Sequence, residues 1–289
     1  MDKDNVEKLE IKYKRKDYIF TMIKGAIVGG TMLVPGVSGG SMAMILGIYN
    51  RLIASVSSFL KNIKDNFIFL GLFAAGAVAG LVILSHPLLY LMENCNRPFM
   101  YFFIGAVAGS IPMVYRQAKI RERTLQSVLK QLIYLVIGMS VVVLFAIVPE
   151  DAFTGAGLNP RDNIVLQLFT GVIAAVALVL PGISVSYMLV LMGIYDTTVA
   201  AISRLDILYL MPIALGLFLG IVLVTKLLES AMEKHPEPTY IIIIGFMIGS
   251  VVQVFPGLPN DVVEWLLSAC LAIVGFNVIL SISGNELKS

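Results

Sequence analysis

The stretch Pro35-Gly36-Val37-Ser38-Gly39-Gly40-Ser41 lies between two apolar runs and decides the fold. It carries no charge, yet it is too rich in glycine and serine for the interior of an ordinary membrane-spanning helix. A second copy, Pro181-Gly182-Ile183-Ser184-Val185-Ser186, follows in the other half of the chain. Proline ends one half-helix and glycine allows the turn. Each stretch therefore predicts a break within a helix, and we expect the two breaks to face each other.

The composition places both stretches in a membrane protein. The chain has 289 residues, of which 58% are hydrophobic and 14% charged, and its mean hydropathy is +0.88. Soluble domains carry about 25% charged residues, so we predict a polytopic membrane protein. Cys95 lies in a predicted loop and Cys270 in a predicted helix, so we expect neither a disulfide nor a metal site. We expect no cofactor, and no basic patch of the nucleic-acid-binding kind is present.

Apolar segments alternate with short polar connections along the chain. The first segment rises only about 25 Å, which is short of the roughly 30 Å hydrocarbon core. Irregular backbone within a membrane needs protein or water around it, so we predict that each motif and its two flanks form a re-entrant helical hairpin. Six to eight full spans remain. The expected segments are 18–34, 41–60, 67–91, 99–115, 128–149, 163–180, 184–202, 207–228, 239–255 and 262–282.

The sequence contains an internal repeat. A shift of 146 residues places Gly25 on Gly171, Pro35-Gly36 on Pro181-Gly182, and Gly47-Ile48-Tyr49 on Gly193-Ile194-Tyr195. After a six-residue deletion, a shift of 140 places Glu93 on Glu233 and Pro98 on Pro238. Each copy crosses the membrane an odd number of times, so the second copy must insert upside down. The predicted fold is all-α, with two inverted repeats, each a re-entrant hairpin plus three transmembrane helices.

Charge sets the predicted orientation. The basic segment 1–17 and the basic connection 115–130 are expected on the cytoplasmic side. We interpret the first apolar run as part of the mature fold, because it lacks a small-residue cleavage signature. Both termini are then cytoplasmic. The expected domains are the N-terminus 1–17, a first repeat 18–149, an external linker 150–162, a second repeat 163–282 and a C-terminus 283–289.

The two motifs are candidate anion sites. Ser38 and Ser184 are placed to cap the half-helix that follows each break. A helix N-terminus behaves as roughly +0.5 charge and, with free amides and hydroxyls, binds phosphate or carboxylate. The alternative is that Pro-Gly only kinks packed helices. The predicted phosphate-binding residues are Ser38, Gly39, Gly40, Ser41, Ser184, Val185 and Ser186, with Lys24 and Arg51 beside them; Pro35, Gly36, Pro181, Gly182, Tyr49 and Tyr195 are expected to shape the hairpins.

Charged residues within apolar runs are functional candidates by default. For Lys24 and Arg51, a binding role and snorkelling to the membrane interface stay open. We interpret Arg204 and Lys226 as snorkelling residues. The paired Gly-x3-Gly spacings, such as Gly76 with Gly80 and Gly105 with Gly109, predict close helix packing and no chemistry.

An enzymatic function has little support in the sequence. Residues 36–40 match the G-x-S-x-G nucleophile pattern, which needs a base beside the serine. Only His86 and His235 exist, the first near the outer end of its segment and the second in a cytoplasmic loop. An intramembrane serine protease is therefore a minor alternative, and we expect no enzyme. A Gly-x4-Gly-Lys-Ser/Thr motif is absent from the sequence, so we do not expect ATP-driven transport within this chain.

The two motifs, together with Ile45-Leu46-Gly47-Ile48-Tyr49 and Gly193-Ile194-Tyr195, resemble the PopT family of bacterial and archaeal membrane proteins, formerly a domain of unknown function. The resemblance covers nearly the whole chain. It implies transport of undecaprenyl phosphate, the polyprenyl-phosphate lipid carrier of cell-wall synthesis, from the outer to the inner leaflet of the cytoplasmic membrane for recycling. The family often has an acidic residue where this chain has Met32, and glycine where it has Val185. The resemblance therefore assigns no coupling carboxylate to this chain. The sequence does not determine whether the coupling ion is a proton or sodium, nor the oligomeric state.

The implied substrate fits the predicted site. Its phosphate monoester is largely dianionic at neutral pH and suits two converging helix ends, while the polyprenyl tail can stay in lipid. The leading prediction is a secondary transporter, a flippase of the alternating-access type. A small-anion transporter or channel using the same site is the alternative, and a membrane scaffold would leave the repeated break unexplained.

Overall fold

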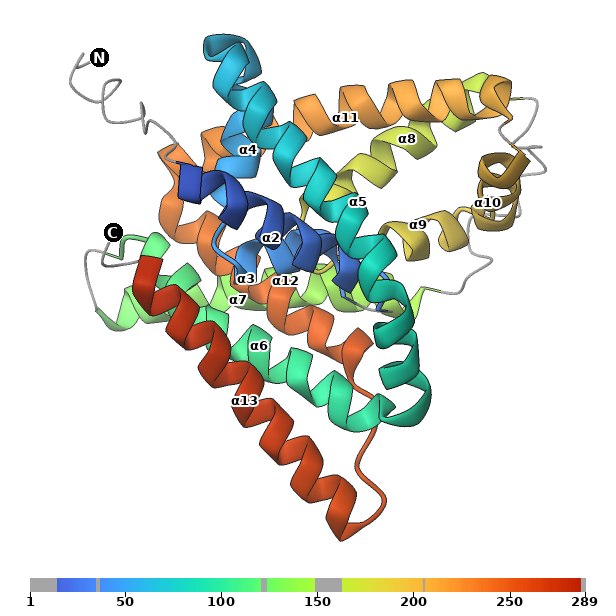
Figure 1. Cartoon of the computed structure of the whole chain (residues 1–289). Coiled ribbons are helices and arrows are strands. Elements are labelled where there is room, and N and C mark those ends of the chain that lie inside the picture. The colour runs from blue at the N-terminus through green and yellow to red at the C-terminus, as the bar shows by residue number, and fades with distance from the viewer. Residues whose placement is uncertain (1–14, 35–36, 121–123, 149–162, 205, 287–289) are drawn as a thin grey trace.

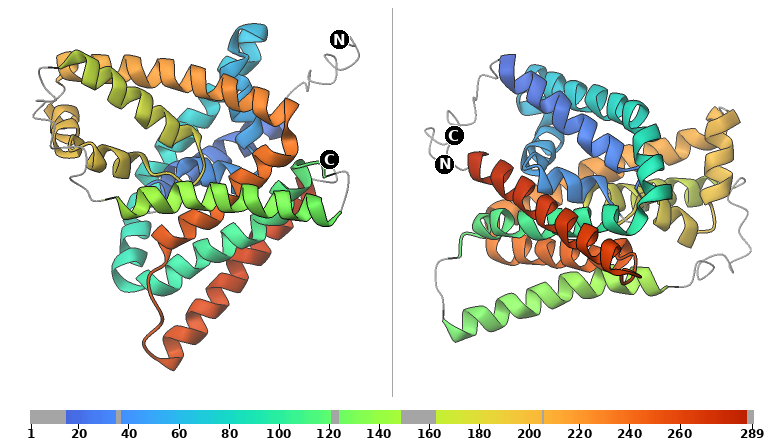
Figure 2. Two further views of the ribbon diagram at one scale, coloured as in Figure 1. Left: turned by 180° about the vertical axis from the view of Figure 1, so that it is seen from behind. Right: turned by 60° about the horizontal axis from the view of Figure 1, so that its bottom comes forward.

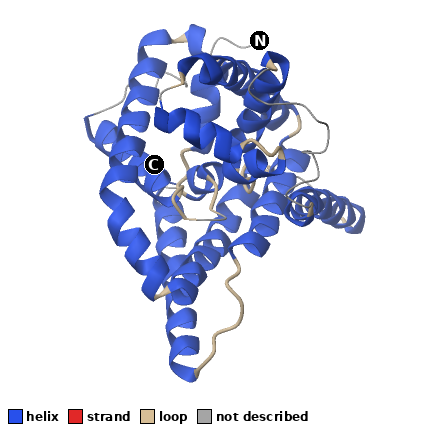
Figure 3. Cartoon of the chain, turned by 90° about the vertical axis from the view of Figure 1, so that its right-hand side faces the viewer, coloured by secondary structure: helices blue, strands red, loops and turns tan. Residues whose placement is uncertain are grey.

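The computed structural model describes residues 15–34, 37–120, 124–148, 163–204 and 206–286. These residues form helices and no strand (Figure 3), which confirms the all-α prediction. Pro35, Gly36, residues 1–14 and the predicted linker 150–162 lie outside the described residues. The first half contains α2 (Arg15–Thr31), α3 (Gly39–Ile45), α4 (Tyr49–Ser57), the short 3-10 helix η1 (Phe59–Lys61), α5 (Ile63–Asn94), α6 (Asn96–Gln117) and α7 (Leu125–Ile147). The second contains α8 (Ile164–Val179), α9 (Val185–Leu191), α10 (Tyr195–Arg204), α11 (Ile207–Lys234), α12 (Pro236–Val254) and α13 (Val262–Glu286).

Six of these helices, namely α5, α6, α7, α11, α12 and α13, are long and apolar enough to cross a membrane. The bent pair α9–α10, with 116° between its two helices, would be a seventh if it were one broken span. Both counts lie within the predicted range of six to eight. The protein is therefore a multi-pass membrane protein in which α6 and α12 are central. In these two helices 56% of the most apolar stretch is buried, against 17% or less in the other four.

Glycine contacts join the helices in four pairs (Figures 1 and 2). A Cβ on Gly80 of α5 would lie 1.9 Å from the Ala26 carbonyl oxygen of α2, and one on Gly216 of α11 would lie 2.1 Å from that of Leu168 in α8. Gly76 faces Met22, four residues before Gly80 and Ala26 in the respective helices. The two helices α5 and α2 therefore run in the same direction. The close packing predicted from the Gly-x3-Gly spacings is confirmed.

The other two pairs contain the central helices. A Cβ on Gly105 of α6 would lie 2.0 Å from the Ala272 carbonyl oxygen of α13, and one on Gly245 of α12 would lie 2.4 Å from that of Leu135 in α7. The pair α2–α5 of the first half corresponds to α8–α11 of the second, and the two pairs that join the halves, α6–α13 and α7–α12, correspond to each other, as a duplicated chain requires. The inverted orientation of the halves stays a prediction.

The second arm of each hairpin differs from the prediction. Residues 41–60 do not form one arm, because α3 and α4 are separated by a turn at Gly47, whose φ is 70°. Gly193, with φ 67°, separates α9 from α10 in the same way. Glycine adopts this left-handed conformation without the Cβ penalty. The Ile48 and Ile194 amides donate to carbonyl oxygens five residues earlier and close the preceding helices.

Candidate functional site

The two Pro-Gly-Ser motifs touch each other in the fold. The Gly182 amide donates a hydrogen bond to Ser38 Oγ at 2.9 Å, across 144 residues of sequence. A Cβ on Gly40 would lie 3.2 Å from the Leu180 carbonyl oxygen and 3.3 Å from Pro181 Cα. The expectation that the breaks face each other is met for the described residues. A site built from both motifs is therefore geometrically available.

Ser38 also caps α3, as the sequence predicted. Its Oγ accepts from the Ser41 amide at 3.1 Å and donates to Ser41 Oγ at 2.9 Å. With the bond from Gly182, its one donor and two acceptor positions are occupied. Ser38 is 6% exposed and Ser41 4%. In this conformation the first motif is closed, and its hydroxyls are engaged within the protein.

The second motif is more open. Ser184 caps α9, as predicted, by accepting from the Tyr187 amide at 3.5 Å. Ser184 and Val185 are half-buried, whereas Ser186 is exposed. Pro181 and Gly182 are buried beneath them, and a Cβ on Gly182 would lie 2.5 Å from the Phe246 carbonyl oxygen of α12. The two copies therefore present different surfaces, one sealed and one accessible.

Tyr49 and Tyr195 are equivalent in the repeat but not in the structure. Tyr49 is 3% exposed, and its hydroxyl donates to the Val179 carbonyl oxygen at 2.7 Å, just before the second motif. Tyr195 is 37% exposed. The first hairpin is thus tied to the second repeat by Tyr49 as well as by Ser38. Gly39, also predicted at the site, faces Met32, since its Cβ would lie 3.1 Å from Met32 Sδ.

The structure does not bring Arg51 to the motifs. Its guanidinium carbon lies 5.3 Å from the centre of the Phe69 ring on α5. The C-terminal end of α2 lies beside Leu84 of α5, where Gly30 makes contact. Residues 69 and 84 are fifteen residues apart, or about 22 Å along the helix. Lys24, half-buried in the middle of α2, is about 10 Å from the end of that helix, and its predicted role stays a prediction.

The sequence does not predict the polar contacts around α4. Asn50 Nδ2 donates to Gln117 Oε1 of α6 at 2.7 Å and to the Tyr240 hydroxyl of α12 at 3.0 Å. Ser57 Oγ donates to Glu229 of α11. No comparable packing joins the equivalent helix α10 to α5 in the part of the chain that the structure describes. The polar residues at the ends of apolar segments were visible in the sequence, but their partners lie 67 to 190 residues away.

The residues of the protease alternative do not assemble in this conformation. The three hydrogen-bonding positions of Ser38 are filled by Ser41 and Gly182. His86 Nδ1 lies 3.4 Å from Ser85 Oγ on α5, and the His86 side chain is exposed. His235 lies at the junction of α11 and α12. A serine–histidine pair at the motif is therefore not formed.

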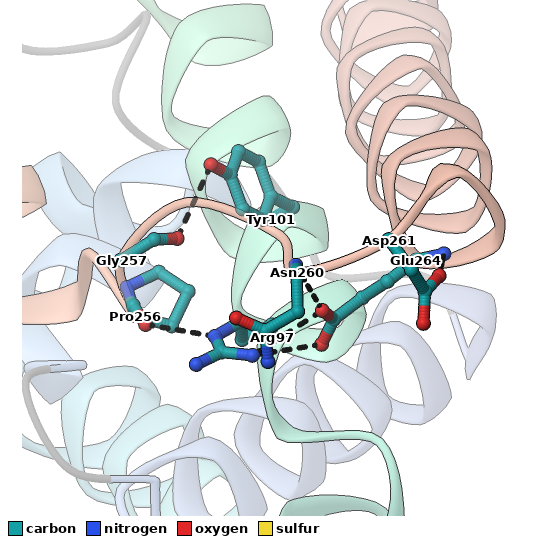
Figure 4. A network of polar contacts seen from close by, with 7 residues as sticks. All are labelled: Arg97, Tyr101, Pro256, Gly257, Asn260, Asp261 and Glu264. Atoms are coloured by element: carbon teal, nitrogen blue, oxygen red, sulfur yellow. Dashed lines mark hydrogen bonds and ion pairs between the residues drawn. The ribbon is translucent and has the colours of Figure 1, made fainter.

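A second polar network lies where α5 meets α6 and α12 turns toward α13 (Figure 4). Arg97 Nη1 is 3.2 Å from Glu264 Oε2, and Arg97 Nε donates to the Pro256 carbonyl oxygen at 3.4 Å. The Asn260 amide donates to the same Glu264 oxygen at 2.6 Å. This network ties the turn 255–261 to α6 and borders a pocket of about 550 Å³.

Comparisons with known proteins find relatives over most of the chain. The chain is 33% identical over 270 residues to a Staphylococcus aureus protein named polyprenyl-phosphate transporter, covering 90% of this chain and 94% of the relative. It is 26% identical over 270 residues to a Vibrio cholerae protein of the same name, covering 89% and 83%. No solved structure matches. Residues 28–270 match the VCA0040-like family, described as undecaprenyl phosphate translocase-like. The chain therefore belongs to this family.

Proposed function

We propose that this protein moves polyprenyl phosphate, with undecaprenyl phosphate as the expected substrate, across the cytoplasmic membrane. The observation that carries the proposal is the hydrogen bond between Ser38 and the Gly182 amide, which brings the two broken-helix motifs into contact. Relatives over most of the chain are named polyprenyl-phosphate transporters. Two helix breaks with hydroxyls and bare amides suit a phosphate head group. The protein would act as a carrier and not as an enzyme.

The phosphate would first meet the second motif, because that copy is the accessible one. The hydroxyls of Ser184 and Ser186 and the amides of the first turn of α9 would supply the donors. The first motif would contribute Ser38 and Ser41 once Ser38 releases Gly182. Gly39 and Gly40 would let the phosphate approach the backbone there, since neither carries a Cβ.

Alternation between two states would move the head group. In the present state α4 is docked against α11, α6 and α12 through Ser57–Glu229 and through Asn50. The predicted topology puts these contacts on the cytoplasmic side, so the present state would be open outward. The inverted repeat would allow α10 to dock on α5 as α4 releases α11. Outer-to-inner transport, which would recycle the carrier, is the direction that the family resemblance implies.

The test is translocation of a fluorescent polyprenyl phosphate in proteoliposomes, with radiolabelled inorganic phosphate as a parallel substrate. We expect the lipid to change leaflets at a rate well above that of protein-free vesicles, and the parent polyprenyl alcohol to remain where it is placed. Uptake of inorganic phosphate without lipid movement would instead support the small-anion transporter. Movement of neither substrate would contradict the proposed function.

A further inference from the structure

Two pockets lie at equivalent places in the two halves of the chain. The pocket beside Arg97 is lined by residues 94–98. A shift of 140 residues places these on residues 234–238, which line a second pocket of about 670 Å³ between α7, the start of α12 and the end of α6. Thr124 of the second pocket corresponds to Glu264 of the first. The duplication therefore produced one pocket at each end of the central helices.

The two pockets carry opposite charge. The first contains Arg97 against the carboxylates of Asp261 and Glu264, and Arg97 is held by Glu264. The second contains three lysines and His235 against the single carboxylate of Glu237; the lysines are Lys119, Lys130 and Lys234. Basic connections mark the cytoplasmic side of a membrane protein, so the second pocket is the cytoplasmic one.

The lysines of the second pocket are not neutralised within the described chain. Glu237 Oε1 instead accepts from Gln131 Nε2 at 3.0 Å and from Ser127 Oγ at 3.4 Å, both neutral donors. Among the described residues, no ion pair joins Lys119, Lys130 or Lys234 to a carboxylate within 4.0 Å. The pocket therefore keeps a surplus of positive charge, whereas the first pocket has the ion pair Arg97–Glu264 at the positions that correspond to Glu237 and Thr124.

Lys119 lies just past the C-terminal end of α6. Its φ is 50°, and no other non-glycine residue in the described ranges has a positive φ. Helices commonly end with a residue in this left-handed conformation, so the backbone of Lys119 marks the end of α6. Lys234 at the end of α11 would by itself only complement the helix dipole. Lys119 is placed in the same way at the end of α6, whereas Lys130 lies in the second turn of α7, where the dipole does not account for a lysine.

We propose that this pocket binds a phosphate monoester on the cytoplasmic side, as the site that receives the lipid head group after it has crossed. The inference rests on the proposed function for the identity of the lipid, but the anion chemistry follows from the pocket alone. Lys130 and Lys234 supply charge from two helices, and Lys119 closes the rim. The charge-balanced pocket on the other side lacks this surplus, so the head group is retained on the basic side.

Lysine acylation followed by mass spectrometry tests the site in lipid nanodiscs. Dioleoyl phosphatidylcholine nanodiscs are prepared with polyprenyl phosphate, with the polyprenyl alcohol, or with inorganic phosphate in the buffer. We expect polyprenyl phosphate to protect Lys130 and Lys234 several-fold relative to Lys61 and Lys64, which lie outside the pocket. Lys130→Gln with Lys234→Gln should weaken binding of polyprenyl phosphate roughly tenfold or more, whereas Lys61→Gln with Lys64→Gln should leave it unchanged.

The outcomes separate the ligand sources and the two proposals. Protection by polyprenyl phosphate and not by the alcohol assigns the lipid head group, and protection by inorganic phosphate alone assigns a soluble phosphate compound. If the reactivity of Lys130 and of Lys234 is the same in all samples, the proposed binding site is wrong. Lysine footprinting does not depend on transport. It therefore tests phosphate binding in the pocket even if the wild-type protein does not translocate lipid. A failure to translocate lipid would count against the proposed function alone.

Discussion

A serine hydroxyl can donate one hydrogen bond and accept two, and Ser38 uses all three to hold the two motifs together. Its partners are Ser41, in its own motif, and the Gly182 amide of the other. Because the side chain is buried, water cannot replace a lost partner. At the residue scale, Ser38 therefore both caps α3 and forms a hydrogen bond between the two halves of the chain.

The substitution Ser38→Ala tests both roles of this side chain. The substitution leaves the Gly182 and Ser41 amides without their acceptor in a buried place, at a cost of about 1–3 kcal/mol. We expect lower thermal stability in detergent and roughly tenfold slower lipid translocation, because the α3 amides lose their alignment. Ser110→Ala is the matched control, since Ser110 is equally buried but donates only to the Val107 carbonyl oxygen of its own helix. Equal effects of the two substitutions would refute the special role of Ser38.

Tyr49→Phe tests the second tie between the halves. It removes the donor to the Val179 carbonyl oxygen, and we expect a loss of about 1 kcal/mol in the free energy of unfolding. Tyr195→Phe changes the repeat-equivalent residue, which is exposed, and should stay within about 0.5 kcal/mol of wild type. Thermal unfolding of both variants in the same detergent gives the comparison. A larger effect at Tyr195 would mean that the second hairpin is the docked one.

At the element scale, glycine contacts hold the helices in pairs that side chains would push apart. Gly80→Ala places a methyl group within 1.9 Å of the Ala26 carbonyl oxygen, so α2 and α5 must separate. We expect a cost of about 1–3 kcal/mol or more. Gly71→Ala lies on the same helix with nothing within 4 Å and should be neutral or stabilising by up to about 1 kcal/mol. Denaturation curves of the two variants decide, and matching curves would disprove the packing role.

The hairpins show where sequence reasoning succeeds and where it stops. Segment length and the Pro-Gly motif predicted the breaks, and serine after the turn predicted the caps at Ser38 and Ser184. The repeated Gly-Ile-Tyr marks the turn at Gly47, but the apolar residues on both sides of it favour a continuous segment. Arg51 is close to the first motif in sequence. After the turn at Gly47, however, its guanidinium lies over the Phe69 ring. Such long-range placement depends on packing between helices that are distant in sequence.

At the scale of the whole molecule, the predicted topology assigns the connection 256–261 to the outside of the membrane and the connection 115–130 to the cytoplasmic side. Leu258 and Leu125 offer exposed positions in these two segments, at 65% and 86% exposure. In a background with Cys95 and Cys270 replaced by serine, we expect Leu258→Cys to react with an impermeant maleimide in intact cells. Leu125→Cys should react only after permeabilisation. Labelling of both from the same side would rule out the predicted orientation.

The last prediction follows from the unequal docking of the two hairpins. Ser57 contacts Glu229, and the repeat places Ser203 on Ser57 and Leu89 on Glu229. Ser203 and Leu89 are exposed and lie on α10 and α5, two helices that do not pack together in the described conformation. If the halves exchange conformations, these two positions must approach each other while Ser57 and Glu229 separate.

Double-cysteine variants with a short bifunctional thiol reagent measure this exchange, again without Cys95 and Cys270. We expect Ser57→Cys with Glu229→Cys to cross-link readily without substrate and to stop translocation once linked, because α4 can no longer leave α11. Under translocating conditions with polyprenyl phosphate, this yield should fall several-fold while Ser203→Cys with Leu89→Cys begins to cross-link. The single-cysteine variants control for non-specific reaction. If α10 never reaches α5 while lipid is moving, the two repeats do not exchange conformations and the proposed alternation is wrong.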